Sequence, residues 1–114
     1  MVSILKWIDS VCCTDYTHMV ALFELSGFQR DVLYVICLEE LQHGKKIKEE
    51  LEKDIGEISR GRLYPNLDTL VKAGYVEKGR IDLRTNYYDL TEFGWEQLRE
   101  RRKWENQFVT FEDL

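Results

Sequence analysis

The stretch of sequence that decides the fold is residues 59–74, which read SRGRLYPNLDTLVKAG. Its apolar residues recur at intervals of three and four and line one face of a helix, at Leu63, Leu67, Leu70 and Val71. Ser59 is a favourable N-terminal cap, and the glycine after Ala73 ends the helix. Pro65 lies beyond the first turn and removes one backbone donor, so we expect the regular helix to begin nearer Arg62.

A second amphipathic helix is predicted just before it, over residues 45–55. Its apolar residues Ile47, Leu51 and Ile55 are spaced by four and form a single stripe to bury. Gly56 follows, and glycine readily takes the left-handed conformation that ends many helices. Two amphipathic helices joined by a short turn that contains glycine indicate a helix-turn-helix.

The segments on either side complete a small fold. Upstream, residues 28–41 are apolar nearly all round and predict a central buried helix. Downstream, the pattern changes to period two, which predicts strands at 75–78 and 86–90 around a polar tip at 79–85. Because side chains alternate along a strand, Tyr88 and Leu90 should share one face.

The expected architecture is mainly α with a small β-hairpin wing, a winged helix-turn-helix. A chain of 114 residues has the size of one domain. We expect an N-terminal helical arm of two short pieces over 1–26 and a winged-helix core over 27–91. Thr91 is expected to cap a C-terminal dimerisation helix over 92–114.

Composition excludes a disordered chain and a protein that coats nucleic acid through net charge alone. Apolar residues make up 44% and charged residues 32% of the chain, enough for a core and a solvated surface. The formal net charge is -5, the wrong sign for unspecific binding to phosphates. Residues 42–90, however, hold ten basic against nine acidic residues, while both flanks are acidic. This clustering favours a cationic face, with ordinary solvated charge as the alternative.

The outward face of the helix at 59–73 carries side chains suited to reading bases. Arg62, Asn66 and Thr69 lie opposite the leucine stripe. Arginine can donate two hydrogen bonds to guanine, and asparagine pairs with adenine in the same bidentate manner. We therefore expect this helix to enter the major groove of double-stranded DNA, with a merely solvated helix face as the alternative.

Two further clusters suit the DNA backbone. The first helix of the pair begins with Lys45, Lys46 and Lys48, where free N–H groups and the helix dipole favour a phosphate. The expected wing concentrates Lys78, Arg80, Arg84, Thr85 and Asn86. Such a wing can hold phosphates or reach the minor groove. Asp82 at the same tip weakens the positive field, so we expect backbone or minor-groove contacts there rather than dense base readout.

Four motifs follow one another through the centre of the chain. They are GRLYPNLDTL at 61–70, GYVE at 74–77, RTN at 84–86 and YDLTEFG at 88–94. This series, within about residues 28–98, resembles the PadR family of winged-helix transcriptional regulators, and especially its archaeal RosR-type members. The resemblance implies a homodimer bound to DNA, with the helix at 59–73 in the major groove and the hairpin as wing. It also implies a structural or phosphate-contacting role for Tyr64.

These arguments predict two sets of contact residues. The DNA-binding set comprises Lys45, Lys46, Lys48, Ser59, Arg60, Arg62, Tyr64, Asn66, Thr69, Lys78, Arg80, Arg84, Thr85 and Asn86. The dimer interface comprises Trp7, Val11, Trp95, Leu98, Trp104 and Phe108. These apolar side chains exceed what a small core needs, although a thick monomer core is the alternative. A dimer would bind a pseudo-palindromic operator with half-sites about ten base pairs apart.

Other functions compete with transcription regulation. The same fold could serve as a protein-protein interaction module without DNA binding. We expect no enzyme, because the chain has no Ser/His/Asp set, no glycine-rich phosphate loop and no paired carboxylates near a histidine. His18 and His43 have no cysteine or acidic partner at metal spacing, so neither a metal nor a cofactor is expected.

The cysteines indicate a reducing compartment. Three cysteines without a CxxC pair, a secretory signal or a membrane span are typical of a cytoplasmic protein. Cys37 is most simply a small core residue. Cys12 and Cys13 are adjacent, and one of them could oxidise or pair across a dimer axis. Since RosR-type regulators are associated with oxidative stress, a stress-responsive regulator is a hypothesis.

Overall fold

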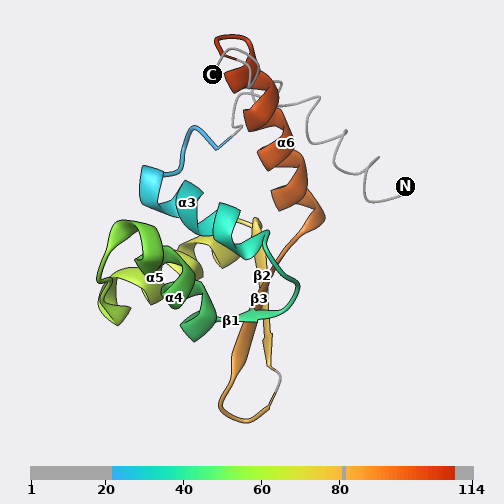
Figure 1. Ribbon diagram of the computed structural model, residues 1–114. Coiled ribbons are helices and arrows are strands. Elements are labelled where there is room, and N and C mark those ends of the chain that lie inside the picture. Colours follow the sequence, from blue (N-terminus) through green and yellow to red (C-terminus); the bar gives the residue numbers. More distant parts are fainter. Residues whose placement is uncertain (1–21, 81, 110–114) are drawn as a thin grey trace, which may run out of the picture. The chain divides into compact units, whose positions relative to one another are not determined.

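The structure is a computed structural model, and it describes residues 22–80 and 82–109 (Figure 1). The elements are α3 (Gly27–Ile36), β1 (Gln42–His43), α4 (Gly44–Ile55), α5 (Arg60–Lys72), β2 (Val76–Arg80), β3 (Asn86–Leu90) and α6 (Glu92–Asn106). Contacts divide the chain into two compact units, Leu25–Glu96 and a second unit of Met1–Glu24 with Gln97–Leu114. A helix pair followed by a hairpin confirms the winged helix-turn-helix. The helical pieces predicted within 1–21 lie outside the described residues.

Helix α3 begins at a capping box. The Ser26 hydroxyl accepts a hydrogen bond from the backbone N–H of Gln29, and the Gln29 side chain accepts one from the Ser26 N–H, both at 3.1 Å. Two N–H groups that a helix start leaves free are thereby satisfied. Val32, Leu33 and Ile36 turn toward the core.

The prediction that this helix runs to residue 41 was wrong, because Gln42 ends it. The Nε2 of Gln42 donates to the carbonyl oxygens of Val35 (2.7 Å) and Ile36 (3.3 Å), which lie at the C-terminus of α3 and need partners there. Leu41 then takes a left-handed conformation (φ 54°), and the chain turns into β1. Leu38 and Leu41 are consequently exposed and not part of a buried helix.

Helices α4 and α5 form the predicted pair, and one carboxylate holds their connection. Gly56 ends α4 with a φ of 95°, as its position after the helix predicted. Glu52 Oε2 accepts hydrogen bonds from the backbone N–H of Ile58 (2.8 Å) and from Lys48 Nζ (2.9 Å). These bonds, the first above all, hold the pKa of Glu52 below its usual value. Ser59 then caps α5 by accepting a backbone hydrogen bond at 3.2 Å.

Helix α5 begins at Arg60, earlier than the expected start near Arg62, and contains Pro65. Proline lacks the N–H that would bond to the carbonyl of Gly61, so it removes one hydrogen bond of the helix. Gly61 is exposed, so a water molecule can donate a hydrogen bond to its carbonyl oxygen in place of the missing N–H. The predicted leucine stripe holds the helix to the core through Leu63, Leu67 and Leu70, which are fully buried.

The hairpin and β1 form a three-stranded antiparallel sheet in the order β1-β3-β2. Tyr88 and Leu90 are buried, which confirms the predicted inner face of β3. Strand β1 was not predicted, because two residues are too few to show a period. Figure 1 shows the end of the β2–β3 hairpin extending beyond α4 and α5. The hairpin with its connecting loop is called the wing below.

The core of the Leu25–Glu96 unit lies between α3, α4, α5 and the sheet. Its buried side chains include Val32, Leu33, Ile36, Ile47, Leu51, Leu63, Leu67, Leu70, Tyr75 and Tyr88. Burying each one contributes roughly 1.5–3 kcal/mol. Ile55, predicted to continue the stripe of α4, is 43% exposed because the helix ends there.

Helix α6 starts at the predicted cap. The Thr91 hydroxyl accepts a hydrogen bond from the N–H of Gly94 (3.0 Å) and donates one to the carbonyl of Gly74 (2.6 Å). A Cβ on Gly94 would collide with the carbonyl oxygen of Tyr75, so only glycine fits there. Among the described residues, none of the helices has the length and apolar character needed to cross a membrane.

The second unit contains a cluster of aromatic rings. The ring of Phe23 meets that of Trp104 edge-on with centroids 4.8 Å apart, and Trp104 meets Phe108 at 5.1 Å. The Arg101 guanidinium lies 4.7 Å from the Trp104 centroid and 5.2 Å from that of Phe23. Aromatic and cation–π contacts of this kind stabilise the cluster.

Candidate nucleic-acid interface

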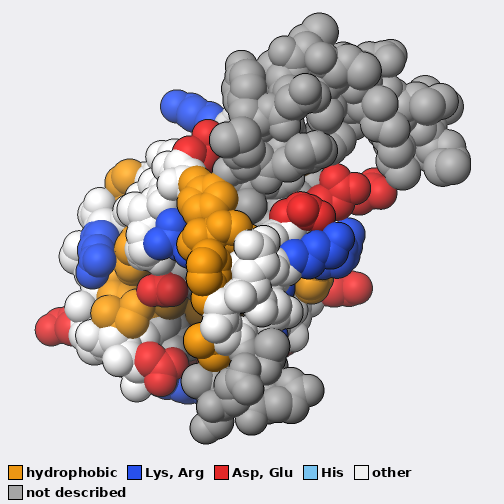
Figure 2. Space-filling view, turned by 90° about the horizontal axis from the view of Figure 1, so that it is seen from above, with side chains coloured by type: hydrophobic (Ala, Val, Ile, Leu, Met, Phe, Trp, Pro, Cys, Tyr) orange, Lys and Arg blue, Asp and Glu red, His pale blue; other side chains and the backbone are white. Residues whose placement is uncertain are grey.

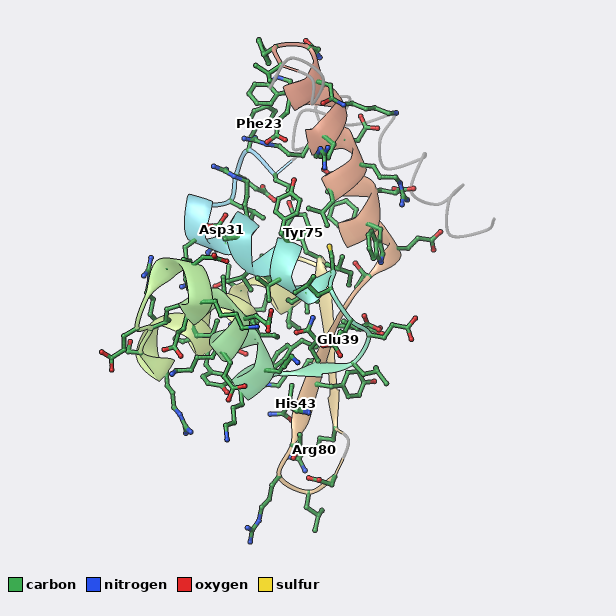
Figure 3. All side chains as sticks on the ribbon, viewed as in Figure 1. Phe23, Asp31, Glu39, His43, Tyr75 and Arg80 are labelled. Atoms are coloured by element: carbon green, nitrogen blue, oxygen red, sulfur yellow. The ribbon has the colours of Figure 1, made fainter. Side chains whose placement is uncertain are left out.

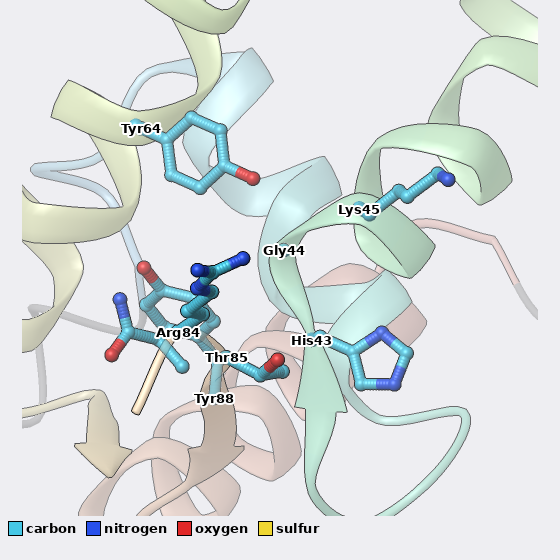
Figure 4. A pocket seen from close by; sticks show the side chains of 8 residues that line it. His43, Gly44, Lys45, Tyr64, Arg84, Thr85 and Tyr88 are labelled. Atoms are coloured by element: carbon cyan, nitrogen blue, oxygen red, sulfur yellow. The ribbon is translucent and has the colours of Figure 1, made fainter. Parts of the chain in front are cut away.

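A pocket of about 310 Å³ opens where the N-terminus of α4, helix α5 and the start of β3 meet (Figure 4). Its lining residues are His43, Gly44, Lys45, Tyr64, Arg84, Thr85, Asn86 and Tyr88. Two of these side chains are cationic, and four offer a hydroxyl or an amide. Among the described residues that line the pocket, none is acidic. Such a lining favours the binding of an anion.

Glycine at position 44 makes room for the ring of Tyr64. A Cβ on Gly44 would lie 2.6 Å from Tyr64 Oη and 2.7 Å from Cε1, so the hydroxyl lies against the first residue of α4. His43, the N-cap residue, makes no side-chain capping bond, and the first turn of α4 contains no acid. The positive end of the helix dipole, where the first N–H groups have no partner within the helix, therefore borders the pocket at Gly44 and Lys45 without an acidic residue in the first turn.

The wing contributes Arg84, whose guanidinium points into the pocket in Figure 4. Tyr88, in β3, also lines the pocket. Burial raises the pKa of Tyr88 to about 12, and the nearby charge of Asp68 and the hydroxyl of Tyr64 add to this effect. The Tyr88 hydroxyl therefore remains neutral at physiological pH and can donate a hydrogen bond.

Of the three lysines predicted to hold phosphate, only Lys45 lines the pocket. Lys46 Nζ lies 3.3 Å from Glu39, and Lys48 Nζ lies 2.9 Å from Glu52. Lys46 therefore has an acidic partner in the loop before α4, and Lys48 has one a helical turn later on α4 itself. A phosphate that approached them would compete with a carboxylate.

The outward face of α5 is less open than its sequence pattern implied. The Arg62 guanidinium lies 4.0 Å from the centroid of the Phe28 ring, a cation–π contact. Asn66 Oδ1 accepts from Gln29 Nε2 (2.9 Å), and Asn66 Nδ2 donates to the carbonyl of Arg62 (2.7 Å). Thr69 donates to a carbonyl of its own helix at 3.0 Å. Ser59 serves as the N-cap, and Arg60 and Arg62 are exposed.

The wing tip is organised by Asp82. Its Oδ1 accepts hydrogen bonds from the backbone N–H groups of Arg84 and Thr85, both at 2.8 Å, and these two bonds lower the pKa of Asp82. The carboxylate, expected only to weaken the positive field, thus also shapes the turn. Arg80 lies opposite Asn86 in the hairpin (Figure 3) and is exposed.

Lys78 is the remaining predicted wing residue. Its Nζ lies 3.6 Å from Asp68 Oδ1 on α5 and 5.9 Å from the Tyr88 centroid, so it links β2 to α5. The sequence patterns missed His43, Gly44 and Tyr88 as lining residues. A glycine before a lysine-rich helix start was an available signal for Gly44. Nothing local distinguishes Tyr88 from an ordinary buried strand residue.

The residues predicted for a dimer interface differ in exposure. Trp95 is 42% exposed and Phe108 67% exposed, whereas Trp104 is half-buried and Leu98 is buried. Trp7 and Val11 lie outside the described residues. Figure 2 shows hydrophobic side chains gathered in a strip on one face, beside basic and acidic ones.

Cys37 has an unreactive environment. Burial raises its pKa to about 11, so the group stays a thiol at neutral pH. Cys12 and Cys13, the two candidates for oxidation, lie outside the described residues. In the described part of the chain, no group of three His, Cys, Asp or Glu side chains could hold a metal ion.

Comparisons with known proteins agree with this architecture. The transcriptional regulator PadR-like family matches residues 32–100. A structure of RosR from H. salinarum, grown from NaBr, is 43% identical, covers 77% of this chain and 81% of that chain, and has a TM-score of 0.71. The complex structure of hsRosR-S1 is also 43% identical, covers 79% of this chain and 81% of that chain, and has a TM-score of 0.72.

A more distant structure shows the same fold. Reduced AbfR bound to DNA is 21% identical, covers 96% of this chain and 82% of that chain, and has a TM-score of 0.67. No curated protein matches the chain. The family match spans more than half of the sequence, and the RosR match more than two thirds. The chain therefore belongs to the PadR-like family of transcriptional regulators.

Proposed function

We propose that this regulator binds double-stranded DNA in a sequence-specific manner, with α5 in the major groove and the wing along the backbone or minor groove. The observation that carries the proposal is the pocket at the N-terminus of α4. Helix α4, helix α5 and the wing each supply a donor to one space whose described lining contains no acid. A phosphate of the DNA backbone has a negative charge and acceptor oxygens, which complement the cations and donors that line this pocket.

The donors of the pocket suit a phosphate diester. The Arg84 guanidinium can bond to two phosphate oxygens at once, and such charge-assisted pairs are among the stronger hydrogen bonds. The hydroxyls of Tyr64 and Thr85 and the free N–H groups of α4 can bond to the others. Lys45 adds a positive charge at the rim. These contacts position the protein and leave the choice of sequence to α5.

Base reading is assigned to the exposed side of α5. Arg62, Asn66 and Thr69 lie on this side, away from the leucines that hold the helix to the core. Arg60 at the start of the helix and Arg80 in the wing are exposed and can contact either phosphates or groove edges.

The regulator is proposed to act as a homodimer on a pseudo-palindromic operator. A winged helix reads one half-site, and a two-fold dimer places two such helices about ten base pairs apart. Exposed Trp95 and Phe108 support an apolar contact between copies, because large exposed aromatic side chains are enriched in interfaces. Together with Trp7, Val11, Leu98 and Trp104, they form the proposed interface set.

The proposal includes no enzymatic activity, a cytoplasmic location and a response to stress. A transcriptional regulator acts where its DNA is, and its family is not one of enzymes. The high pKa of the Cys37 thiol leaves Cys12 and Cys13 as the candidates for oxidation. DNA affinity should then fall or rise with peroxide in the wild type and not in the Cys12→Ser/Cys13→Ser variant. Equal affinities with and without peroxide in both proteins would remove the redox hypothesis.

The test of DNA binding is selection of bound sequences from a random duplex pool at two salt concentrations. The wild type should enrich an inverted repeat, and Arg62→Ala/Asn66→Ala should lose it. Arg84→Ala should weaken binding to every sequence without changing the enriched bases. Lys53→Ala is the matched control, because Lys53 on α4 is paired with Glu50 and does not line the pocket.

The competing function is a protein-protein interaction module built on the same fold. It predicts that the folded wild type enriches no sequence at either salt concentration. It also predicts that Arg62→Ala/Asn66→Ala leaves any weak binding to nucleic acid unchanged.

A further inference from the structure

A relay of hydrogen bonds connects the start of α3 with the outward face of α5. The backbone N–H of Ser26 donates to Gln29 Oε1 (3.1 Å), and Gln29 Nε2 donates to Asn66 Oδ1 (2.9 Å). Asn66 Nδ2 then donates to the backbone carbonyl of Arg62 (2.7 Å). Two side-chain amides thus lie in series between two backbone groups, and Gln29 and Asn66 are both partly buried.

The two backbone ends allow the relay only one polarity. A backbone N–H can only donate, so the Gln29 atom that faces Ser26 must be its oxygen. The other end of the Gln29 amide is then the NH₂ group, which requires an oxygen of Asn66 opposite it. A backbone carbonyl can only accept, so Arg62 independently requires the NH₂ group of Asn66 on its side. Both requirements select the same orientation of the Asn66 amide.

We propose that Gln29 is a specificity-positioning residue, which fixes the orientation in which the Asn66 amide meets the bases. This proposal rests on the proposed function, in which α5 enters the major groove. Each polar atom of Asn66 already makes one hydrogen bond within the protein, so Oδ1 keeps one acceptor position and Nδ2 keeps one N–H. The relay determines where that acceptor and that donor point. A reversed amide would present the opposite pattern and match a different base edge.

The neighbouring residue of α3 supports the same arrangement. The Arg62 guanidinium lies over the Phe28 ring, with its Cζ 4.0 Å from the ring centroid. Arg62 also provides the carbonyl that ends the relay. Two consecutive residues of α3, which itself carries no predicted DNA contact, therefore hold the two side chains expected to read bases.

Gln29→Glu is the discriminating variant. Glutamate keeps an oxygen for the Ser26 N–H, so the capping box survives. It removes the donor to Asn66 and places a carboxylate oxygen opposite Oδ1, which makes the observed amide orientation unfavourable. Ser26→Asp is the matched control: it adds the same charge at the same helix end and keeps a capping oxygen and the backbone N–H. Gln29→Met removes the donor without adding charge.

The experiment selects bound sequences from a random duplex pool with full-length wild type, Gln29→Glu, Gln29→Met, Ser26→Asp and Asn66→Ala. Thermal unfolding of each protein verifies folding. In each half-site, Asn66→Ala should change the base preference at one position by about fivefold or more. Gln29→Glu should alter the same position, and Ser26→Asp should leave it as in the wild type. Gln29→Met leaves the Arg62 carbonyl to select the same amide orientation, so its change at this position should be smaller than that of Gln29→Glu. If the added charge abolishes DNA binding by Gln29→Glu, this smaller change in Gln29→Met is the one that tests the relay.

The outcomes separate this proposal from the function on which it rests. A wild type that enriches no sequence overturns the proposed function and this proposal with it. An enriched wild-type repeat with unchanged preference in both Gln29 variants overturns the relay alone. The relay also fails if Asn66→Ala keeps every base preference, because Asn66 then reads no base. A change at the Asn66 position in a folded Gln29 variant, absent from Ser26→Asp, supports it.

Discussion

Substituting Gly44 by alanine should push the Tyr64 ring out of its present position, because the added methyl group would collide with it. The Cβ would lie 2.6 Å from Tyr64 Oη, 2.7 Å from Cε1 and 2.9 Å from Cζ. An ordinary contact begins at 3.4 Å, so the Tyr64 ring has to withdraw by about 0.8 Å. Gly44 does not have a positive φ, so the helix backbone itself accepts alanine.

The expected change in stability has two opposing parts. Overpacking costs about 1–3 kcal/mol, and alanine in place of glycine in a helix gains roughly 0.5–1 kcal/mol. Gly44→Ala should therefore lower the free energy of unfolding by up to about 2.5 kcal/mol. In a Tyr64→Ala background the clash is absent, so the same substitution should be neutral or stabilising by up to about 1 kcal/mol.

Urea unfolding of the four proteins in this double-mutant cycle measures the coupling between the two sites, expected at about 1–3 kcal/mol. Fluorescence anisotropy with a selected operator should show DNA binding weakened roughly tenfold by Gly44→Ala, because one hydrogen bond to a phosphate is lost. Equal effects of Gly44→Ala on stability in both backgrounds would refute the argument. Full DNA affinity in a variant with a displaced ring would remove Tyr64 from the phosphate contacts.

Three further outcomes are expected. The logarithm of the DNA association constant should fall linearly with the logarithm of salt concentration. Arg84→Ala should make this slope shallower by about 0.9, and Lys53→Ala should leave it unchanged. Equal slopes for Arg84→Ala and the wild type would show that Arg84 contacts no phosphate. Because the folded pKa of Asp82 lies below 3.8, its stabilisation of the tip is present above that pH and is lost as the pH falls through the lowered value. Amide hydrogen exchange at Thr85, followed by NMR, should lose protection in that acidic range, and Asp82→Ala should lack protection at every pH. In a variant without the other cysteines, Cys37 should react with iodoacetamide at pH 9 at least about tenfold more slowly when folded than in denaturant, since its pKa rises from 9.0 to about 11; similar rates would contradict the buried thiol. The same raised pKa means that its contribution to stability is full below pH 9 and is lost as the pH rises toward 11.

Features that depend on neighbours in sequence were predictable. The leucine spacing predicted α5, Ser59 and Gly56 marked helix ends, and the alternation around Tyr88 gave the inner face of β3. Each of these follows from a short-range period or from the backbone preference of one residue type. The resemblance of ordered motifs to the PadR family added the overall architecture.

Features that depend on distant partners were not predictable. The α3 helix stops early because Gln42 reaches back to its last carbonyls, and nothing in residues 28–41 announces that contact. Of the three lysines of α4, only Lys48 has a partner that local spacing predicts, because Glu52 lies four residues later on the same helix. The pairing of Lys46 with Glu39 and the position of Lys45 at the pocket depend on how the chain folds.

By itself, the sequence determined the order of helices and strands, the caps of α5 and α6 and the leucine stripe on α5, because these depend on preferences that act within a few residues. Tertiary structure alone decided that Lys45 and Arg84 line the same pocket and which way the Asn66 amide faces. A hydrogen bond or ion pair forms between whatever groups the fold brings within about 3 Å, and that proximity spans many residues of chain, as from Gln29 to Asn66.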